Sequence, residues 1–251
     1  MSLIIAGYGY VGKAIHETFK DIVDCTIVDP AFNNNRMQDF APTHVIIAVS
    51  TPEAKDGSCD MSNVLDVLQH VDPKTPTLIK STISVEGWRE IKKSYPDHRI
   101  TFSPEFLRAK TATQDFQNTQ HIYLAGHWSH AWIVFFKKRF PTIHYSIRKT
   151  PEELILAKYF RNAYLANKVT FFNQVYDLCD RLDLNYQQVR EVVSDDPRIG
   201  WAHTEVTEER GYGGHCLPKD TRAIVNTAKQ VDVKLSLIEE ATKYNKKIRK
   251  H

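Results

Sequence analysis

The sequence predicts an α/β fold in which a doubly wound, mainly parallel sheet is followed by a long helix and a small all-helical domain. Three observations predict it. Short apolar runs alternate with helical stretches over residues 1–149, a glycine-rich turn follows the first apolar run, and no Gly or Pro interrupts the chain from Glu152 until well past residue 180. We therefore expect one domain over residues 1–149 and a second over residues 150–251.

Seven apolar runs in the first domain are expected to be strands, because each is short and they alternate with helical stretches. They are Leu3–Ala6, Thr26–Asp29, His44–Val49, Thr77–Lys80, Ile100–Phe102, Ile122–Leu124 and Ile143–Tyr145. The helices expected between them are Val11–Phe19, Asn63–His70, Val85–Tyr95 and Ser129–Arg139. Five aromatic residues gather around the last of these, and we interpret them as core packing rather than a base-stacking surface. They are Trp128, Trp132, Phe135, Phe136 and Phe140.

The second domain begins with a sequence pattern typical of a helix N-terminus. Thr150 offers a capping hydroxyl, Pro151 suits the first helical position, and Glu153 completes a capping box. A helix that runs from there to about Leu182 would span roughly 50 Å. Three shorter helices are expected after it, over Tyr186–Val193, over Thr221–Gln230, and from a second capping box at Ser236.

Composition, charge and cysteine spacing indicate which classes of protein the sequence does not resemble. With 42% hydrophobic residues the chain can bury a sizeable core, and a net charge of +3 gives no whole-chain argument for nucleic acid. The four cysteines form no CxxC pair, and we see neither a secretory leader nor an apolar run long enough to span a membrane. The histidines show no metal-ligand spacing. We expect a cytoplasmic protein with no metal, no nucleic-acid partner and no membrane partner.

The first motif predicts a dinucleotide site. Gly7, Gly9 and Gly12 form a GxGxxG pattern that follows an apolar strand and opens a helix, the context of a Rossmann-like domain. Tyr8, Tyr10 and Val11 complete that turn and are expected to contact the cofactor. Asp29 ends the next strand, where its carboxylate can bind an adenosine ribose. No Lys or Arg follows until Arg36 to neutralise a 2′-phosphate, so NAD is favoured over NADP.

A second cofactor contact is expected where the third strand ends. Ser50, Thr51 and Pro52 follow that strand, and ligands of open α/β sheets bind outside the carboxyl ends of strands. Thr51 could instead only shape the turn before Pro52.

The second motif surrounds one cysteine. Residues 211–220 read Gly-Tyr-Gly-Gly-His-Cys-Leu-Pro-Lys-Asp, with three glycines before Cys216 and a cation and a carboxylate after it. Lys219, and the positive end of a helix that starts near Asp220 or Thr221, would favour the nucleophilic thiolate. The alternative is a glycine-rich turn with a bystander cysteine.

Four separated segments together resemble the UDP-glucose/GDP-mannose dehydrogenase family. They are Lys80–Gly87, Phe102–Arg108, Lys158–Asn162 and the cysteine segment, and they occur in the family's order. The resemblance implies an NAD-dependent enzyme that oxidises the primary alcohol of a nucleotide sugar such as UDP-glucose to the uronic acid, a step of polysaccharide biosynthesis. It also implies a homodimer paired through the long helix.

The resemblance assigns residue roles. Cys216 would carry thiohemiacetal and thioester intermediates, and Asp220 with Lys158 would remove the hydroxyl proton. Lys158 and Asn162 would stabilise the oxyanion, while Glu105 and Thr82 would position the hydrolytic water, Thr82 beside the cofactor. Substrate contacts are implied for Phe106, Leu107, Arg108, Lys158, Asn162, Gly213 and Gly214.

Each residue also has a structural interpretation. Lys158 could extend from a helix flank, Asn162 could bridge neighbouring helices, and Glu105 could form a surface ion pair. The chain also departs from the family. Ala109 stands where a second glutamate is usual, the stretch over residues 200–210 differs, and the expectation is a short relative without the C-terminal nucleotide-sugar-binding domain.

Two other functions therefore stay open. The chain could bind NAD with little or no turnover, as Ala109 suggests. It could also be a two-electron dehydrogenase of the 3-hydroxyacid or 6-phosphogluconate type, although that reaction gives Cys216 no role.

Overall fold

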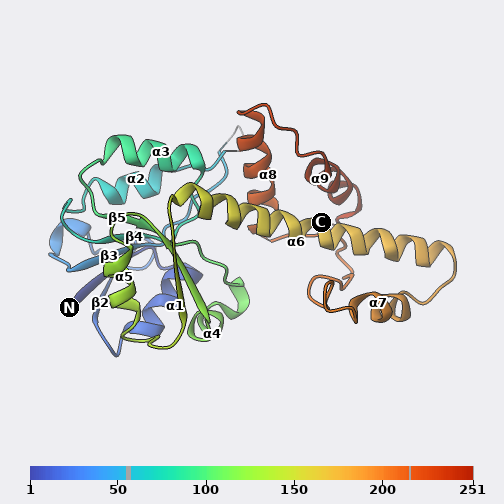
Figure 1. Cartoon of the computed structure of the whole chain (residues 1–251), viewed down its shortest axis with the longest axis horizontal. Helices are drawn as coiled ribbons and strands as arrows, with labels where there is room; N and C mark the ends of the chain where they lie inside the picture. Colours follow the sequence, from blue (N-terminus) through green and yellow to red (C-terminus); the bar gives the residue numbers. More distant parts are fainter. Residues whose placement is uncertain (55–57, 215, 251) are drawn as a thin grey trace. The chain divides into compact units, whose positions relative to one another are not determined.

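The computed structural model describes residues 1–54, 58–214 and 216–250. The chain divides into two compact units, Met1–Lys158 and Tyr159–His251. The first contains the sheet and the second is helical (Figure 1).

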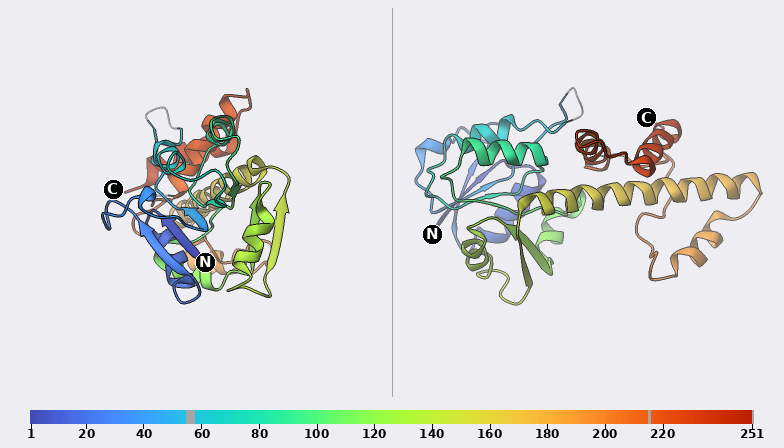
Figure 2. Two further views of the ribbon diagram at one scale, coloured as in Figure 1. Left: turned by 90° about the vertical axis from the view of Figure 1, so that its left-hand side faces the viewer. Right: turned by 45° about the horizontal axis from the view of Figure 1, so that its top comes forward.

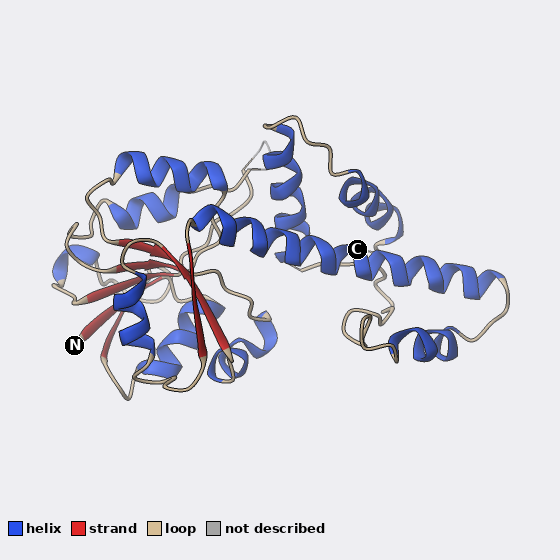
Figure 3. Cartoon of the chain, viewed as in Figure 1, coloured by secondary structure: helices blue, strands red, loops and turns tan. Residues whose placement is uncertain are grey.

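The first unit contains a seven-stranded sheet in the order β2-β1-β3-β4-β5-β6-β7 (Figure 3). Its strands are β1 (Ser2–Ala6), β2 (Asp24–Val28), β3 (His44–Ile47), β4 (Thr77–Ile79), β5 (Ile100–Phe102), β6 (His121–Ala125) and β7 (His144–Arg148). Every neighbouring pair is parallel except β5 and β6. The expected doubly wound, mainly parallel sheet is confirmed. Because β2 and β3 flank β1 on opposite sides, the strand order reverses beside β1, and ligands of open α/β sheets bind at such a point.

The α-helices among the described residues of this unit are α1 (Tyr10–Phe19), α2 (Ser62–Leu68), α3 (Val85–Ser94), α4 (Ala112–Gln117) and α5 (Ser129–Phe136). Figure 1 shows α2 and α3 on one face of the sheet and α1, α4 and α5 on the other. The helix α4 was not predicted from the sequence, because its six residues are too few to show a helical period. The short 3-10 turn at Ala109–Thr111 precedes it.

The aromatic residues around α5 form core, as expected. Trp132, Phe135 and Phe136 are fully buried, and Phe140 is 6% exposed. Phe135 packs against Phe19 of α1 with ring centroids 5.0 Å apart. Trp128 is the exception, because it is 38% exposed and lies under the guanidinium of Arg99.

The second unit is built around α6 (Pro151–Arg181), whose first residues belong to the first unit. Figures 1 and 2 show α7 (Tyr186–Ser194) on one side of this helix, and α8 (Cys216–Lys229) and α9 (Ser236–Ile248) on the other. Two apolar clusters lie against α6, one shared with α7 and one with the segment that leads into α8. Phe172 and Cys179 pack with Tyr186 of α7, and Ala166 and Val169 pack with Tyr212.

Two helix starts differ from the sequence expectation. The helix α8 begins at Cys216 rather than near Thr221, because Pro218 falls in the first turn, where backbone N–H groups have no intrahelical partner anyway. The helix α9 already includes Ser236, and its N-terminal flanking residue, Leu235, provides no side-chain cap. None of the helices in the described residues combines the length and the apolar character needed to cross a membrane.

Candidate active site

The glycine turn has the geometry that a dinucleotide pyrophosphate requires. Gly7 has φ +95°, and a Cβ there would lie 2.6 Å from the carbonyl oxygen of Ala48, which follows β3. A Cβ on Gly12 would lie 2.0 Å from the Gly7 carbonyl oxygen, whereas one on Gly9 would meet nothing within 4 Å. Gly7 and Gly12 therefore allow close packing of the turn, and Gly9 leaves its outer side open. The helix α1 starts directly after Gly9 without a side-chain cap or an acidic first turn, which suits an anion.

The Asp29 carboxylate fixes the same turn through hydrogen bonds. Its Oδ2 accepts the N–H of Tyr8 at 2.6 Å, and its Oδ1 accepts the N–H of Ala31 at 2.8 Å. Each oxygen retains capacity for a further hydrogen bond, so a ribose hydroxyl can still bind. The Tyr8 ring also packs against the Phe32 ring, with centroids 4.4 Å apart and the planes tilted by 48°. Tyr10 is 39% exposed as the first residue of α1, and Val11 is half-buried.

The second expected cofactor segment follows β3, the neighbour of β1. Thr51 is 7% exposed, while Ser50 and Pro52 are exposed. Asn63 of α2 donates to the Ser50 carbonyl at 3.0 Å, which fixes this turn. Thr82 follows β4 and is half-buried, and its carbonyl accepts the Cys59 thiol at 3.3 Å.

Glu105 occupies a buried ion pair, not the surface ion pair offered as its structural interpretation. Its Oε2 lies 2.8 Å from Lys80 Nζ, with the two side chains 9% and 3% exposed. Its Oε1 accepts the N–H of Phe106 at 2.9 Å. Lys80 ends the strand segment that leads to Thr82, so the ion pair joins two of the segments that carry the family resemblance.

The residues after Glu105 turn outward. Phe106 and Leu107 are half-buried, and Arg108 is exposed. Asp115 of α4 accepts from the Arg108 guanidinium at 2.6 Å, which holds the pKa of this carboxyl well below its usual range. Arg108 is thus fixed at the surface by α4.

The second unit brings Asn162, Asp220 and Cys216 to two adjoining helices. Asp220 is 1% exposed, and its Oδ2 accepts from Asn162 Nδ2 at 2.6 Å. Its Oδ1 lies 3.0 Å from Lys219 Nζ, an ion pair whose geometry is not aligned for a hydrogen bond. Cys216 precedes Asp220 by one turn of α8, so the two lie on one side of that helix. Asn162 also bridges helices, as its structural interpretation anticipated.

Lys158 is 8% exposed and lies one turn before Asn162 on α6. The residue is thus buried rather than exposed on a helix flank. Gly213 is half-buried and Gly214 is exposed with φ +76°. His215, which belongs to the cysteine segment, lies outside the described residues.

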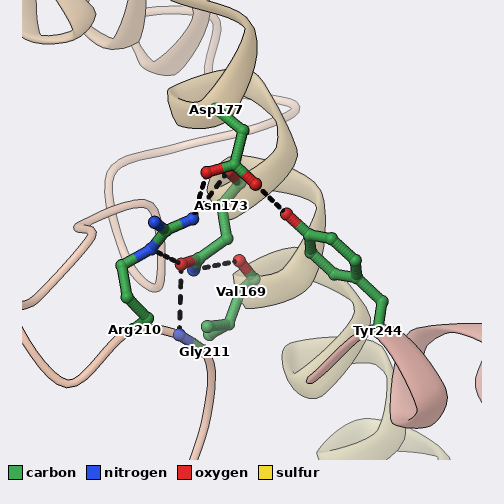
Figure 4. A network of polar contacts seen from close by, with 6 residues as sticks. All are labelled: Val169, Asn173, Asp177, Arg210, Gly211 and Tyr244. Carbon is green, nitrogen blue, oxygen red and sulfur yellow. Dashed lines mark hydrogen bonds and ion pairs between the residues drawn. The ribbon is translucent and has the colours of Figure 1, made fainter. Parts of the chain in front are cut away.

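A polar network fixes the start of the cysteine segment to α6 (Figure 4). The buried Asn173 accepts from Arg210 Nε at 2.9 Å and from Gly211 N–H at 3.1 Å, and donates to the Val169 carbonyl at 2.9 Å. Arg210 also pairs with Asp177, whose other oxygen accepts the Tyr244 hydroxyl. Burial raises the pKa of Tyr244 to about 12, assisted by its bond to Asp177.

A second anchor holds the next residue. Asn245 of α9 accepts the Tyr212 N–H at 2.7 Å and donates to the Tyr212 carbonyl at 3.0 Å. A Cβ on Gly211 would lie 2.2 Å from Asn245 Oδ1, and one on Gly213 would lie 2.4 Å from the Arg249 guanidinium. The glycines therefore let α9 approach the segment that leads to Cys216.

Sequence reasoning missed Lys80, Asn173, Arg210 and Asn245 as supports of the site. Two of these residues could have been recognised from their positions in the sequence. Lys80 directly follows the buried run Thr77–Ile79, and Asn173 continues the buried α6 positions Ala166 and Val169. Among residues 1–54, 58–214 and 216–250 no group of three His, Cys, Asp or Glu side chains could hold a metal ion.

The family follows from two matches. Residues 31–132 match the NAD binding domain of the UDP-glucose/GDP-mannose dehydrogenase family, and residues 153–247 match its central domain. The chain belongs to this family.

Its relatives within the family are longer. The UDP-glucose 6-dehydrogenase of Rhizobium meliloti is 33% identical over 221 residues, which are 80% of this chain and 49% of the relative. UDP-glucose 6-dehydrogenase TuaD of Bacillus subtilis is 29% identical over 246 residues, which are 92% of this chain and 53% of the relative. The chain spans about half the length of these curated relatives.

Solved structures show the same fold. A UDP-glucose dehydrogenase from Pyrobaculum islandicum superposes with a TM-score of 0.84 at 24% identity, covering 98% of this chain and 68% of that one. The Mycobacterium tuberculosis 3-hydroxyisobutyrate dehydrogenase superposes with a TM-score of 0.77 at 17% identity, covering 98% and 92%. The fold is therefore shared with dehydrogenases whose names describe a different substrate.

Proposed function

We propose that the chain carries out NAD-dependent oxidation of the primary alcohol of a nucleotide sugar of the UDP-glucose type, through covalent intermediates on Cys216. The observation that supports it most is in the second unit. Cys216 is the first residue of α8, and one turn later Asp220 is buried and hydrogen-bonded to Asn162. These residue types and their order match the family's segments.

The residues of the first unit fit NAD. Gly7 and Gly12 close the turn, Gly9 leaves it open to a pyrophosphate, and Asp29 lies where a ribose would bind. Ser50, Thr51, Pro52 and Thr82 follow the neighbouring strands β3 and β4. The cofactor would supply a hydride acceptor, used twice for each sugar.

The first oxidation needs a base. The alcohol loses its hydroxyl proton to this base and its carbon loses a hydride, which gives an aldehyde and NADH. Asp220 is our candidate base, acting through an ordered water with help from Lys158. Its contacts with Asn162 and Lys219 hold its carboxylate in one orientation.

The second oxidation needs a nucleophile. The Cys216 thiolate attacks the aldehyde carbon, whose oxygen becomes the thiohemiacetal oxyanion, and transfer of a hydride from this carbon to a second NAD leaves a thioester. Water then attacks the thioester carbon, the carbon–sulfur bond breaks, and the acid and thiolate are released. Lys158 and Asn162 would stabilise the oxyanions, and loss of one such donor typically costs about 3 kcal/mol of barrier.

Cys216 is a better candidate nucleophile than the other cysteines. None of the four is joined in a disulfide in the described structure, and Cys59 and Cys179 are buried. Burial raises the pKa of Cys25 to about 11, which leaves little thiolate at neutral pH. Free thiols also fit a reducing compartment, and we propose the cytoplasm.

Mass spectrometry of the intact protein tests the chemistry. After incubation with NAD and UDP-glucose, we expect a sugar adduct on Cys216 that is absent from Cys216→Ser and retained in Cys25→Ser. NAD binding with neither adduct nor NADH would support a binding protein instead.

We further propose that two copies pair through α6. Tyr164, Phe171 and Leu178 are 63%, 56% and 61% exposed and recur every seven residues, the spacing of a helix-pairing seam. Phe160, one turn before Tyr164, is 44% exposed. Light scattering should show a dimer that Phe171→Glu converts to a monomer, and a monomeric wild type would contradict the pairing.

A further inference from the structure

We infer that Lys80 is a positioning residue for Glu105, which orients that carboxylate toward the water that hydrolyses the Cys216 thioester. The inference rests on the proposed function. Its evidence is the geometry of one buried ion pair in the first unit.

The sheet brings the two residues together. Ile79 and Phe102 are register partners at the ends of the parallel strands β4 and β5, and Ser103 N–H donates to the Ile79 carbonyl at 3.0 Å. The chain therefore leaves the sheet at Lys80 and at Ser103 side by side. The first path leads to Thr82 and the second to Glu105.

The Lys80 ammonium lies among three oxygens: Ser103 Oγ and the Pro104 carbonyl accept hydrogen bonds from it, and Glu105 Oε2 forms an ion pair that is not aligned for a hydrogen bond. It lies 2.8 Å from Glu105 Oε2, 3.2 Å from Ser103 Oγ and 3.4 Å from the Pro104 carbonyl. All three acceptors belong to the Glu105 segment. The side chain is 3% exposed, and the Phe116 ring lies 5.8 Å from its nitrogen. Lys80 thus fixes the whole turn as well as the carboxylate.

These contacts distinguish the two carboxylate oxygens. Oε2 faces Lys80 and is inaccessible to solvent. Oε1 accepts the N–H of Phe106 at 2.9 Å, and a carboxylate oxygen has two lone pairs, so it can accept a further hydrogen bond. Oε1 is the oxygen that can accept a proton from water as the water oxygen bonds to the thioester carbon.

Stability alone does not account for the pair. A buried ion pair often contributes no more net stability than apolar residues of the same volume, because desolvation offsets the attraction. Orientation of a general base is a better reason, since a positioned base contributes on the order of a hundredfold or more in rate. Ala109 strengthens the argument, because the chain has no second glutamate four residues after Glu105.

The test compares wild type with Lys80→Met, Glu105→Gln and the double variant, with Lys93→Met of the exposed α3 surface as a control. We expect Lys80→Met to form the first NADH at the wild-type rate, to accumulate the adduct on Cys216, and to turn over about tenfold more slowly or worse. Glu105→Gln should show the same pattern. The double variant should be no slower than Glu105→Gln alone, because Lys80 acts through Glu105.

The outcomes separate this inference from the proposed function. An active wild type with Lys80→Met unchanged, or a double variant slowed by the product of the two single effects, would overturn the positioning role. Lys80→Met leaves the Glu105 carboxylate buried without its ion-pair partner, so it could fail to fold; the double variant lacks this charge and then replaces it in the test. If both variants fail to fold, Lys80 serves the fold alone and the positioning role is overturned. A wild type that forms neither NADH nor adduct would contradict the proposed function itself.

Discussion

The buried amide oxygen of Asn173 accepts the backbone N–H of Gly211 at 3.1 Å and so fixes the start of the Cys216 segment to the middle of α6. The same oxygen accepts Arg210 Nε at 2.9 Å (Figure 4). One side chain therefore satisfies two partly buried donors from consecutive residues.

We expect Asn173→Leu to lower the free energy of unfolding by about 2 kcal/mol or more. The substitution keeps a similar volume but leaves the Gly211 N–H and one Arg210 donor unsatisfied, and each such group typically costs about 1–3 kcal/mol. Urea unfolding measures the change. Gln174→Leu, at the next, exposed position of α6, is the matched control and should stay within about 0.5 kcal/mol. Equal stabilities of the two variants would contradict the anchoring role.

Gly211 should tolerate alanine less well than Gly200. Both have positive φ, +55° and +67°, so alanine costs about 1–2 kcal/mol of backbone strain at either position. A Cβ on Gly200 meets nothing within 4 Å, whereas one on Gly211 would displace the Asn245 amide that holds Tyr212. We expect a further loss of about 1–3 kcal/mol for Gly211→Ala by urea unfolding. Equal losses of unfolding free energy in the two variants would mean that α9 moves away from the added methyl group with no loss of stability.

The glycine turn allows cofactor binding to be separated from folding. A Cβ on Gly9 meets no protein atom within 4 Å, so Gly9→Ala should melt close to the wild-type temperature yet bind NAD at least about tenfold more weakly by calorimetry. Gly12→Ala should instead lower the melting temperature, because its Cβ would lie 2.0 Å from the Gly7 carbonyl. Unchanged NAD affinity in Gly9→Ala would place the pyrophosphate elsewhere.

The Asp177–Tyr244 pair predicts a pH dependence with a definite sign. The folded pKa of Tyr244 is raised from 10.0 to about 12, so its contribution to stability is full below pH 10 and is lost as pH rises towards 12. Burial acts to raise the pKa of Asp177, but Tyr244 and Arg210 outweigh it and hold the pKa below its ordinary value. The Asp177 contribution is therefore present at neutral pH and lost only in acid.

Urea unfolding from pH 7 to 11.5 tests the predicted loss of the Tyr244 contribution to stability at alkaline pH. The stability difference between wild type and Tyr244→Phe should be constant from pH 7 to about 9 and shrink above pH 10, because phenylalanine does not titrate. A difference that stays flat to pH 11.5 would show that the Tyr244 hydroxyl is not held in this way.

The sequence predicted the sheet and the long helix because both give strong local patterns. All seven strands were expected, and α6 ends at Arg181, one residue before its expected end. The start of α8 was expected near Asp220 or Thr221 and lies at Cys216, because the first turn of a helix can include Pro218. The supports of the site were missed for another reason. Lys80 meets Glu105, and Asn173 meets Gly211, only after folding brings distant segments together.

The stoichiometry of NADH formed per sugar nucleotide consumed tests the central claim most directly. Our account predicts a ratio of two for wild type with UDP-glucose or a related sugar nucleotide, and loss of the complete oxidation in Cys216→Ser. A ratio of one, retained in Cys216→Ser, would contradict the thioester route and favour a two-electron dehydrogenase of the hydroxyacid type.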